Sequence, residues 1–139
     1  MKREYIFVYG TLRSDCGGKL AHWLSRHWGF VGMGFFQGTL FEVNQYPGAV
    51  PCVETQNRVL GEVYRLYDQE PVLARLDDYE ECSERFSVPH EYKRVKAEIN
   101  FAEGDAVQAW VYVYNLPVDR LEQIHSGDYA RYLLDKSTP

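Results

Sequence analysis

The stretch Ile6-Phe7-Val8-Tyr9-Gly10-Thr11-Leu12-Arg13 decides much of the fold, because an apolar run changes within it into a glycine turn. Apolar side chains that follow one another without polar alternation predict a strand buried on both faces, over Glu4–Tyr9. A strand that breaks at Gly10 leaves successive backbone N–H groups unpaired, and such groups bind an anion or an oxyanion. The junction is therefore the first candidate for a binding site.

The rest of the chain predicts a small α+β domain with few helices. Helices are expected over Lys19–His27, which has apolar residues on one face, and over Pro71–Glu80, where a proline suits the first turn. Strands are expected over the glycine-interrupted aromatic stretch Phe30–Val43, over Val59–Leu66, and over Val95–Phe101 and Val107–Tyr114, which should pair as an antiparallel hairpin. We therefore expect one domain over residues 1–139, a compact and highly curved mixed β-sheet or small β-barrel with two to three short helices. Only residues 136–139 should form a free tail.

Composition and charge limit the classes of partner. The chain has 139 residues, of which 45% are hydrophobic, so it can bury one sizeable core. A net charge of −5 argues against binding to nucleic acid or to an anionic membrane, since both reward clusters of lysine and arginine. We expect a small soluble ligand, and the sequence leaves the oligomeric state open.

The chain shows no sign of targeting or of a metal site. Its N-terminal apolar run is too short for a signal peptide, and no stretch reaches membrane-spanning length. The three cysteines, Cys16, Cys52 and Cys82, show neither CxxC nor Cys/His ligand spacing. We therefore expect a cytoplasmic protein without disulfides, metal or other cofactor.

Four motifs follow one another along the chain: Val8–Arg13, Gly61–Tyr64, Leu76–Glu80 and Tyr92–Arg94. In this order and spacing they resemble the γ-glutamylcyclotransferase family, specifically its small AIG2-like or γ-glutamylamine cyclotransferase branch. Members of that family fold as a compact α+β barrel and cyclise a γ-glutamyl group to 5-oxoproline, releasing the attached amine. The resemblance implies that Tyr9, Gly10, Thr11 and Leu12 hold the substrate through main-chain groups. It also implies that Glu80 is the catalytic acid/base.

The chemistry explains why these residue types are needed. In a γ-glutamyl compound the α-amine can attack its own γ-carbonyl, so the protein must fold the substrate and move protons without supplying a nucleophile. A carboxylate can take a proton from the attacking ammonium and give one to the departing nitrogen if its pKa lies well above the usual glutamate value of about 4.3. Burial, the C-terminal end of a helix, and repulsion from Asp77 and Asp78 would each raise the pKa of Glu80.

Other residues have a structural and a functional interpretation. Glu80 taken alone would usually be an exposed carboxylate at the end of a helix. The adjacent Glu81 is the alternative candidate for the catalytic carboxylate. Glu62 should point inward and make a structural hydrogen bond. Possible further pocket residues are Tyr92, Arg94 and Tyr114, although a strand arginine is more often a surface group.

Two other chemistries fail on spacing. The run from Gly10 to Lys19 is no phosphate-binding loop, because Leu20 stands where a magnesium-binding hydroxyl is required. Cys16 has no orienting third group that would mark it as a thiol nucleophile.

The chain departs from the family in two places. An asparagine often found before the first helix is missing, and the stretch Glu81–Glu91 is longer than in many relatives, which suggests a lid over the site. A non-catalytic small-carboxylate binding module on the same fold, or an amidohydrolase or acyl transferase using the same pocket, are the alternative functions. The sequence does not name the leaving amine.

Overall fold

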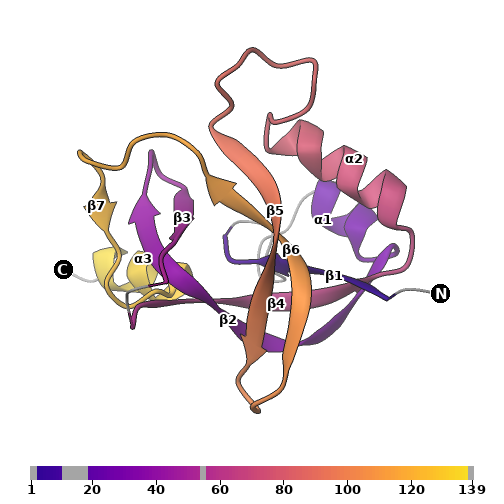
Figure 1. Ribbon diagram of the computed structural model, residues 1–139, viewed down its shortest axis with the longest axis horizontal. Helices are drawn as coiled ribbons and strands as arrows, with labels where there is room; N and C mark the ends of the chain where they lie inside the picture. Colours follow the sequence, from indigo (N-terminus) through magenta and orange to yellow (C-terminus); the bar gives the residue numbers. More distant parts are fainter. Residues whose placement is uncertain (1–2, 11–18, 54–55, 138–139) are drawn as a thin grey trace.

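The computed structural model describes residues 3–10, 19–53 and 56–137, and its centre is a closed five-stranded barrel (Figure 1). The barrel strands in spatial order are β2 (Trp28–Glu42), β4 (Arg58–Leu66), β1 (Glu4–Val8), β6 (Ala106–Tyr114) and β5 (Tyr92–Phe101). The barrel closes because β5 also pairs with β2, where Gly34 lies opposite Phe101. The expected curved α+β fold is thus confirmed in its closed form.

Strand β2 is long enough to belong to two sheets. Its first half pairs with β4, and its second half pairs with β3 (Pro47–Pro51) and β7 (Glu122–Gln123) outside the barrel. At Gly34, where β2 pairs with β4 and also with β5, a Cβ atom would lie 2.8 Å from Ile99 Cγ2 and 3.2 Å from the Asn100 carbonyl. Barrel closure therefore depends on the absence of a side chain at this position.

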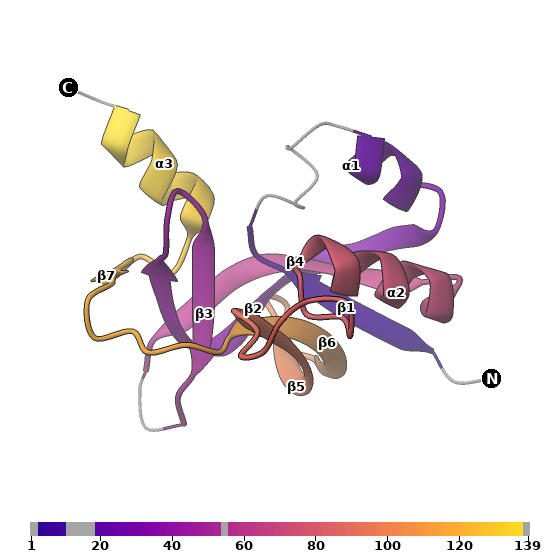
Figure 2. The same cartoon turned by 90° about the horizontal axis from the view of Figure 1, so that it is seen from above.

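Strand β1 is buried on both faces, as its sequence predicts. Phe7 belongs to the core inside the barrel, whereas Ile6 and Val8 belong to a second core beneath α1 (Lys19–Leu24) and α2 (Gln69–Tyr79). Figure 2 shows α1 and α2 on the same side of the barrel and α3 (Tyr129–Ser137) at the opposite end. The apolar run of β1 thus reflects two different neighbours, the barrel interior and the helix layer.

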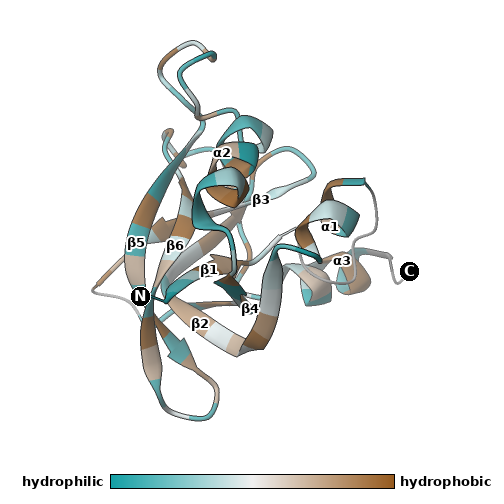
Figure 3. Ribbon diagram, turned by 90° about the vertical axis from the view of Figure 1, so that its right-hand side faces the viewer, coloured by the Kyte–Doolittle hydropathy of each residue, from teal (hydrophilic) through white to brown (hydrophobic). Residues whose placement is uncertain are grey.

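The predicted hairpin is confirmed, with β5 and β6 antiparallel and Ile99 opposite Val107. Figure 3 shows hydrophilic colours at the turn that joins these strands. No described helix is both long and apolar enough to cross a bilayer.

Three local expectations differ from the structure. Helix α1 ends at Leu24 rather than His27, because the amides of Arg26 and His27 turn back to carbonyls three residues earlier before the chain enters β2. The strands β3 and β7 and the helix α3 were not expected. The free tail from residue 136 is wrong, since Lys136 lies within α3 and its Nζ is 3.1 Å from Glu42 Oε2.

Candidate active site

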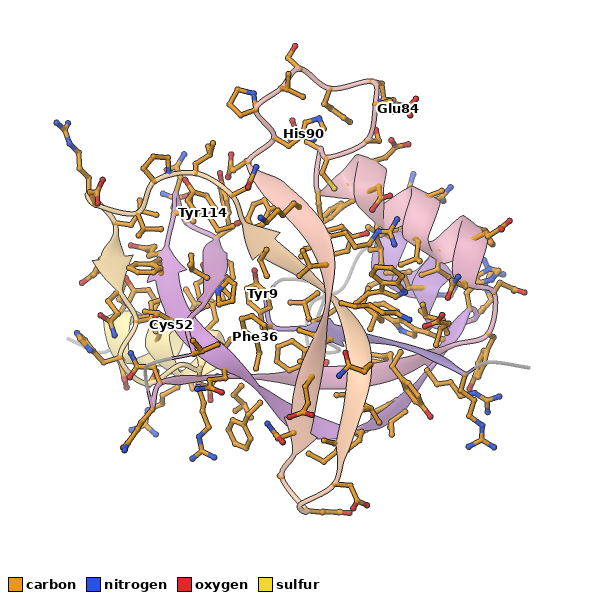
Figure 4. The ribbon with its side chains drawn as sticks, in the orientation of Figure 1. Tyr9, Phe36, Cys52, Glu84, His90 and Tyr114 are labelled. Atoms are coloured by element: carbon orange, nitrogen blue, oxygen red, sulfur yellow. The ribbon has the colours of Figure 1, made fainter. Side chains whose placement is uncertain are left out.

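A cavity of about 750 Å³ opens where β1 ends beside the C-terminal end of α2. The loop between α2 and β5, which carries Glu84 and His90 in Figure 4, forms another part of the wall. Four of the residues expected at the site line this one cavity, namely Tyr9, Gly10, Glu80 and Tyr92. Segments that are far apart in the sequence therefore meet at one place.

Glu80 caps the C-terminal end of α2. Its backbone N–H donates to the Leu76 carbonyl at 2.8 Å, which fixes the residue to the last turn of the helix. Its side chain faces the cavity, and within the described ranges no donor is recorded on its carboxylate. Burial, followed by the nearby Glu91 and Glu81 carboxylates, raises the pKa of Glu80 to about 7.

The neighbours that raise this pKa are not those expected from the sequence. Asp77 accepts hydrogen bonds from Arg94 Nε at 2.9 Å and from the Tyr112 hydroxyl at 2.7 Å. Asp78 accepts one from the Ser83 hydroxyl at 2.7 Å. Arg94 offsets the charge of Asp77, and Arg85 Nη1 lies 3.7 Å from Asp78 Oδ2, so the repulsion on Glu80 comes from glutamates instead.

Asp77 and Arg94 also hold the C-terminal end of α2 in place. Arg94 binds both oxygens of Asp77, with Nη2 at 3.2 Å from the second oxygen, and its guanidinium lies 4.5 Å from the centre of the Trp110 ring. The interaction joins the last turn of α2 to β5 and β6, one turn before Glu80. Arg94 does not line the cavity, so it supports the end of α2 from outside the cavity.

The turn at Gly10 is packed closely against the first residue of β3. A Cβ atom at Gly10 would lie 2.8 Å from Pro47 Cγ. The Tyr9 hydroxyl donates to the Tyr112 carbonyl at 2.6 Å and accepts from the Ala49 amide at 3.1 Å, so it is already used in joining strands. Thr11 and Leu12 lie outside the described residues.

Tyrosines and a further carboxylate complete the wall. The Tyr92 hydroxyl donates to the Pro47 carbonyl at 2.6 Å, while Tyr114 packs nearly perpendicular to the Tyr92 ring, with centroids 5.6 Å apart, and is not part of the lining. The Tyr46 hydroxyl donates to Glu91 Oε1. Sequence reasoning did not select Tyr46 or Glu91, and the only available signal was the place of Glu91 directly before the Tyr92–Arg94 motif.

The comparisons with known proteins agree with the motifs. The family model described as gamma-glutamyl cyclotransferase, AIG2-like, matches residues 6–131. The chain belongs to this family. It is 36% identical over 124 residues to the gamma-glutamylcyclotransferase family protein YtfP of Escherichia coli K12, covering 89% of this chain and 94% of that protein.

Two solved structures resemble the fold of this gamma-glutamyl cyclotransferase family member. The solution structure of YtfP from Escherichia coli aligns with a TM-score of 0.63 at 34% identity, covering 96% of this chain and 99% of that one. The crystal structure of an AIG2-like protein from Mus musculus aligns with a TM-score of 0.70 at 26% identity, covering 90% and 88%. The resemblance predicted from four short motifs is therefore confirmed over most of the chain.

The remaining acidic side chains of this family member take different roles. Glu81 is exposed and has a left-handed backbone, with φ of 56°. Glu62 points inward, with only 7% of its surface exposed, and accepts a hydrogen bond from the Tyr64 hydroxyl at 3.1 Å. In the part of the chain that the structure describes, no three His, Cys, Asp or Glu side chains are grouped closely enough to hold a metal ion.

Cys82, the described cysteine whose thiol lies near Glu80, does not supply a reactive thiolate. Burial, and then the Asp77 and Glu80 carboxylates, raise the pKa of the Cys82 thiol to about 11, so it stays protonated near neutral pH. Cys16 lies outside the described residues. A proton-transfer group at Glu80 is thus the chemistry that this cavity offers most directly.

Proposed function

We propose that the protein is a gamma-glutamyl cyclotransferase that releases 5-oxoproline and an amine from a small γ-glutamyl compound. One observation carries the proposal: Glu80, with a pKa near 7, lines the same cavity as the Gly10 turn. A carboxylate with this pKa is present in both protonation states near neutral pH, as an acid/base that serves twice in one turnover requires.

In the proposed reaction the substrate supplies its own nucleophile. The α-ammonium loses a proton to the Glu80 carboxylate, and the resulting amine attacks the γ-carbonyl carbon to form the ring C–N bond. The tetrahedral intermediate collapses when the bond to the departing nitrogen breaks and Glu80 returns a proton to that nitrogen. Glu80 then takes the second proton from the ring nitrogen and passes it to the released amine. Overall the α-nitrogen loses two protons and the departing amine gains two, so the reaction consumes no water and needs no redox partner.

The Gly10 turn would hold the rest of the glutamyl group. Main-chain N–H groups of the segment Tyr9, Gly10, Thr11 and Leu12 would receive the substrate α-carboxylate or the developing oxyanion. One well-placed oxyanion donor contributes about 3 kcal/mol to transition-state stabilisation. Because the Tyr9 hydroxyl is occupied by Tyr112 and Ala49, the contribution of Tyr9 would come from its backbone and ring.

Proton transfer and intramolecular attack are sufficient for this reaction, so we infer that the enzyme works without a metal ion.

The loop Glu81–Glu91 lines the cavity with Phe86, Ser87, Pro89 and His90. Its function as a lid that selects the leaving amine stays a prediction.

The test is a product assay with a panel of γ-glutamyl amines, amides and peptides. Formation of 5-oxoproline with an equal amount of amine supports the proposal. Formation of glutamate would instead indicate a hydrolase, and saturable binding without turnover would indicate a binding module. Glu84→Gln is the matched control for Glu80→Gln, because Glu84 lies on the loop that follows α2 but does not line the cavity.

A further inference from the structure

The cavity contains a carboxylate that the proposed proton transfers do not use. Glu91 lies at the end of the α2–β5 loop, directly before β5, and is half-buried in the cavity wall. Tyr46, which is 45 residues away in the sequence and also lines the cavity, donates its hydroxyl to Glu91 Oε1. Burial and the Glu91 carboxylate raise the pKa of Tyr46, so Tyr46 remains a neutral hydrogen-bond donor.

The charge of the cavity wall has one sign. Glu80, Glu81 and Glu91 line it, and no lysine or arginine does so among the described residues. Arg94 is bound to Asp77 behind the wall. His90 directs its Nε2 to the Phe86 carbonyl at 3.1 Å, within its own loop. A guest that carries a positive charge therefore meets complementary charge in a partly desolvated site.

The size of the cavity leaves room for this guest. A volume of about 750 Å³ lies within the range of about 300–1,000 Å³ that suits drug-sized ligands, which is much larger than a glutamyl group alone. A γ-glutamyl compound can bring an ammonium group to this space from two sources. One is its own α-ammonium, and the other is an ammonium at the far end of the leaving amine.

We propose that Glu91, oriented by Tyr46, recognises an ammonium group of the substrate. This inference rests on the proposed function, since it assigns a specificity-determining residue to the same cavity. A carboxylate that accepts one hydrogen bond from Tyr46 retains acceptor capacity for an ammonium N–H. Charge-assisted hydrogen bonds of this kind are roughly twice as strong as neutral ones. Glu80 moves protons, and Glu91 binds a charge.

The experiment compares two substrates that differ only by a terminal ammonium: γ-glutamyl-n-butylamine and γ-glutamyl-1,4-diaminobutane. Values of kcat and KM are measured at pH 8 for the wild type, Glu91→Gln, Tyr46→Phe and the control Glu84→Gln. We expect Glu91→Gln to raise KM by about tenfold or more, the loss of one charge-assisted contact, with kcat changed far less. Tyr46→Phe should give a smaller rise in KM with the same substrate pattern, and Glu91→Asp, which keeps the charge, should recover part of the loss.

The pattern across the substrates identifies the source of the ammonium. A rise in KM for both compounds assigns Glu91 to the α-ammonium, and a rise for the diamine compound alone assigns it to the leaving amine. An unchanged KM for both, or a fall in kcat without a change in KM, overturns the proposal. If the wild type forms no 5-oxoproline from either compound, the proposed function fails instead. The same compounds are then used in calorimetric titrations, where equal Kd values for wild type and Glu91→Gln overturn the recognition role.

Discussion

The C-terminal end of α2 and the helix α3 both carry charged side chains beside the barrel, but the partners and the burial of those charges differ. On α3, the exposed Lys136 lies 3.1 Å from Glu42 Oε2 and 3.8 Å from Glu122, and the Tyr132 hydroxyl donates to Glu122 at 2.6 Å. Each charge there has an opposite or polar partner in contact with solvent. Such a cluster fastens a helix to a strand and offers no reactive group.

At the end of α2 the charges are divided between two environments. Asp77 is held by Arg94 and Tyr112, whereas the Glu80 carboxylate, one turn later, faces a cavity that also holds Glu91. The difference teaches that chemistry is expected where a partly buried charge lacks a compensating partner, since only there does the pKa move toward neutrality. Four predictions test this contrast between the two helix ends.

The largest effect is expected at Glu80. Because Glu80→Gln removes the proposed proton-transfer group and keeps its size, kcat should fall by about 10²–10⁴-fold. The measurement is the rate of 5-oxoproline formation at saturating substrate. Full activity in Glu80→Gln would contradict the assigned role, and Glu84→Gln should retain activity.

The second effect concerns the Arg94–Asp77 ion pair, which holds the end of α2 one turn before Glu80. Arg94→Met leaves the Asp77 carboxylate with only the Tyr112 hydroxyl among the partners described above, and we expect a loss of about 2 kcal/mol in the free energy of unfolding. The end of α2 would also be held less firmly, so kcat should fall in Arg94→Met. Arg94→Lys keeps the positive charge and should retain part of the wild-type kcat. Urea denaturation and steady-state kinetics measure the two changes. Wild-type kcat in a folded Arg94→Met variant would show that the Arg94–Asp77 ion pair does not contribute to catalysis.

A smaller effect is expected on stability at different pH values. The pKa of Glu80 is raised to about 7 in the folded protein, above its unfolded value, so the folded state binds the proton more tightly. Ionisation of Glu80 therefore lowers the stability of the wild type as the pH rises from about 4.5 to 7. Glu80→Gln should be more stable than the wild type at pH 8, by about 1–2 kcal/mol, and this gain should disappear below about pH 4.5. Thermal unfolding over this pH range measures it, and an equal gain at every pH would contradict this origin.

The smallest effect is expected on α3. Lys136→Met removes an exposed ion pair that is screened by salt, so Tm should change less than in Arg94→Met and 5-oxoproline formation should remain at the wild-type level. Differential scanning fluorimetry at low and high salt measures the change. A large loss of activity would show that the two helix ends are not independent.

Local sequence patterns predicted the fold where the physical cause is itself local. The uninterrupted apolar run Ile6-Phe7-Val8 indicated burial on both faces, and alternation over Val95–Phe101 indicated a half-exposed strand of a hairpin. Helix α3 was not predicted: it is short, its described part is mostly exposed, and only Tyr129 and Tyr132 of its described side chains pack on the barrel core. The short strands β3 and β7 exist only because the second half of β2 continues beyond the barrel and needs partners.

The candidate site shows the same division. The sequence selected Glu80, Tyr9, Gly10 and Tyr92, and these residues line one cavity. It also selected Arg94 and Tyr114, which lie behind the wall, because a motif does not state on which face of a strand each side chain points relative to a helix. Tyr46 had no signal, since a tyrosine in a turn is usually only a surface residue.

The sequence by itself determined the doubly buried strand, the glycine turn that follows it and the carboxylate at the end of a helix, because these depend on neighbouring residues. Only the tertiary structure decided that Glu91 and Glu81, rather than Asp77 and Asp78, raise the pKa of Glu80. Only the packing of segments far apart in the chain brings Tyr46 to Glu91 and Arg94 to Asp77. The physical reason is that ionisation depends on distance and burial in space, and these are set by contacts between segments far apart in the chain.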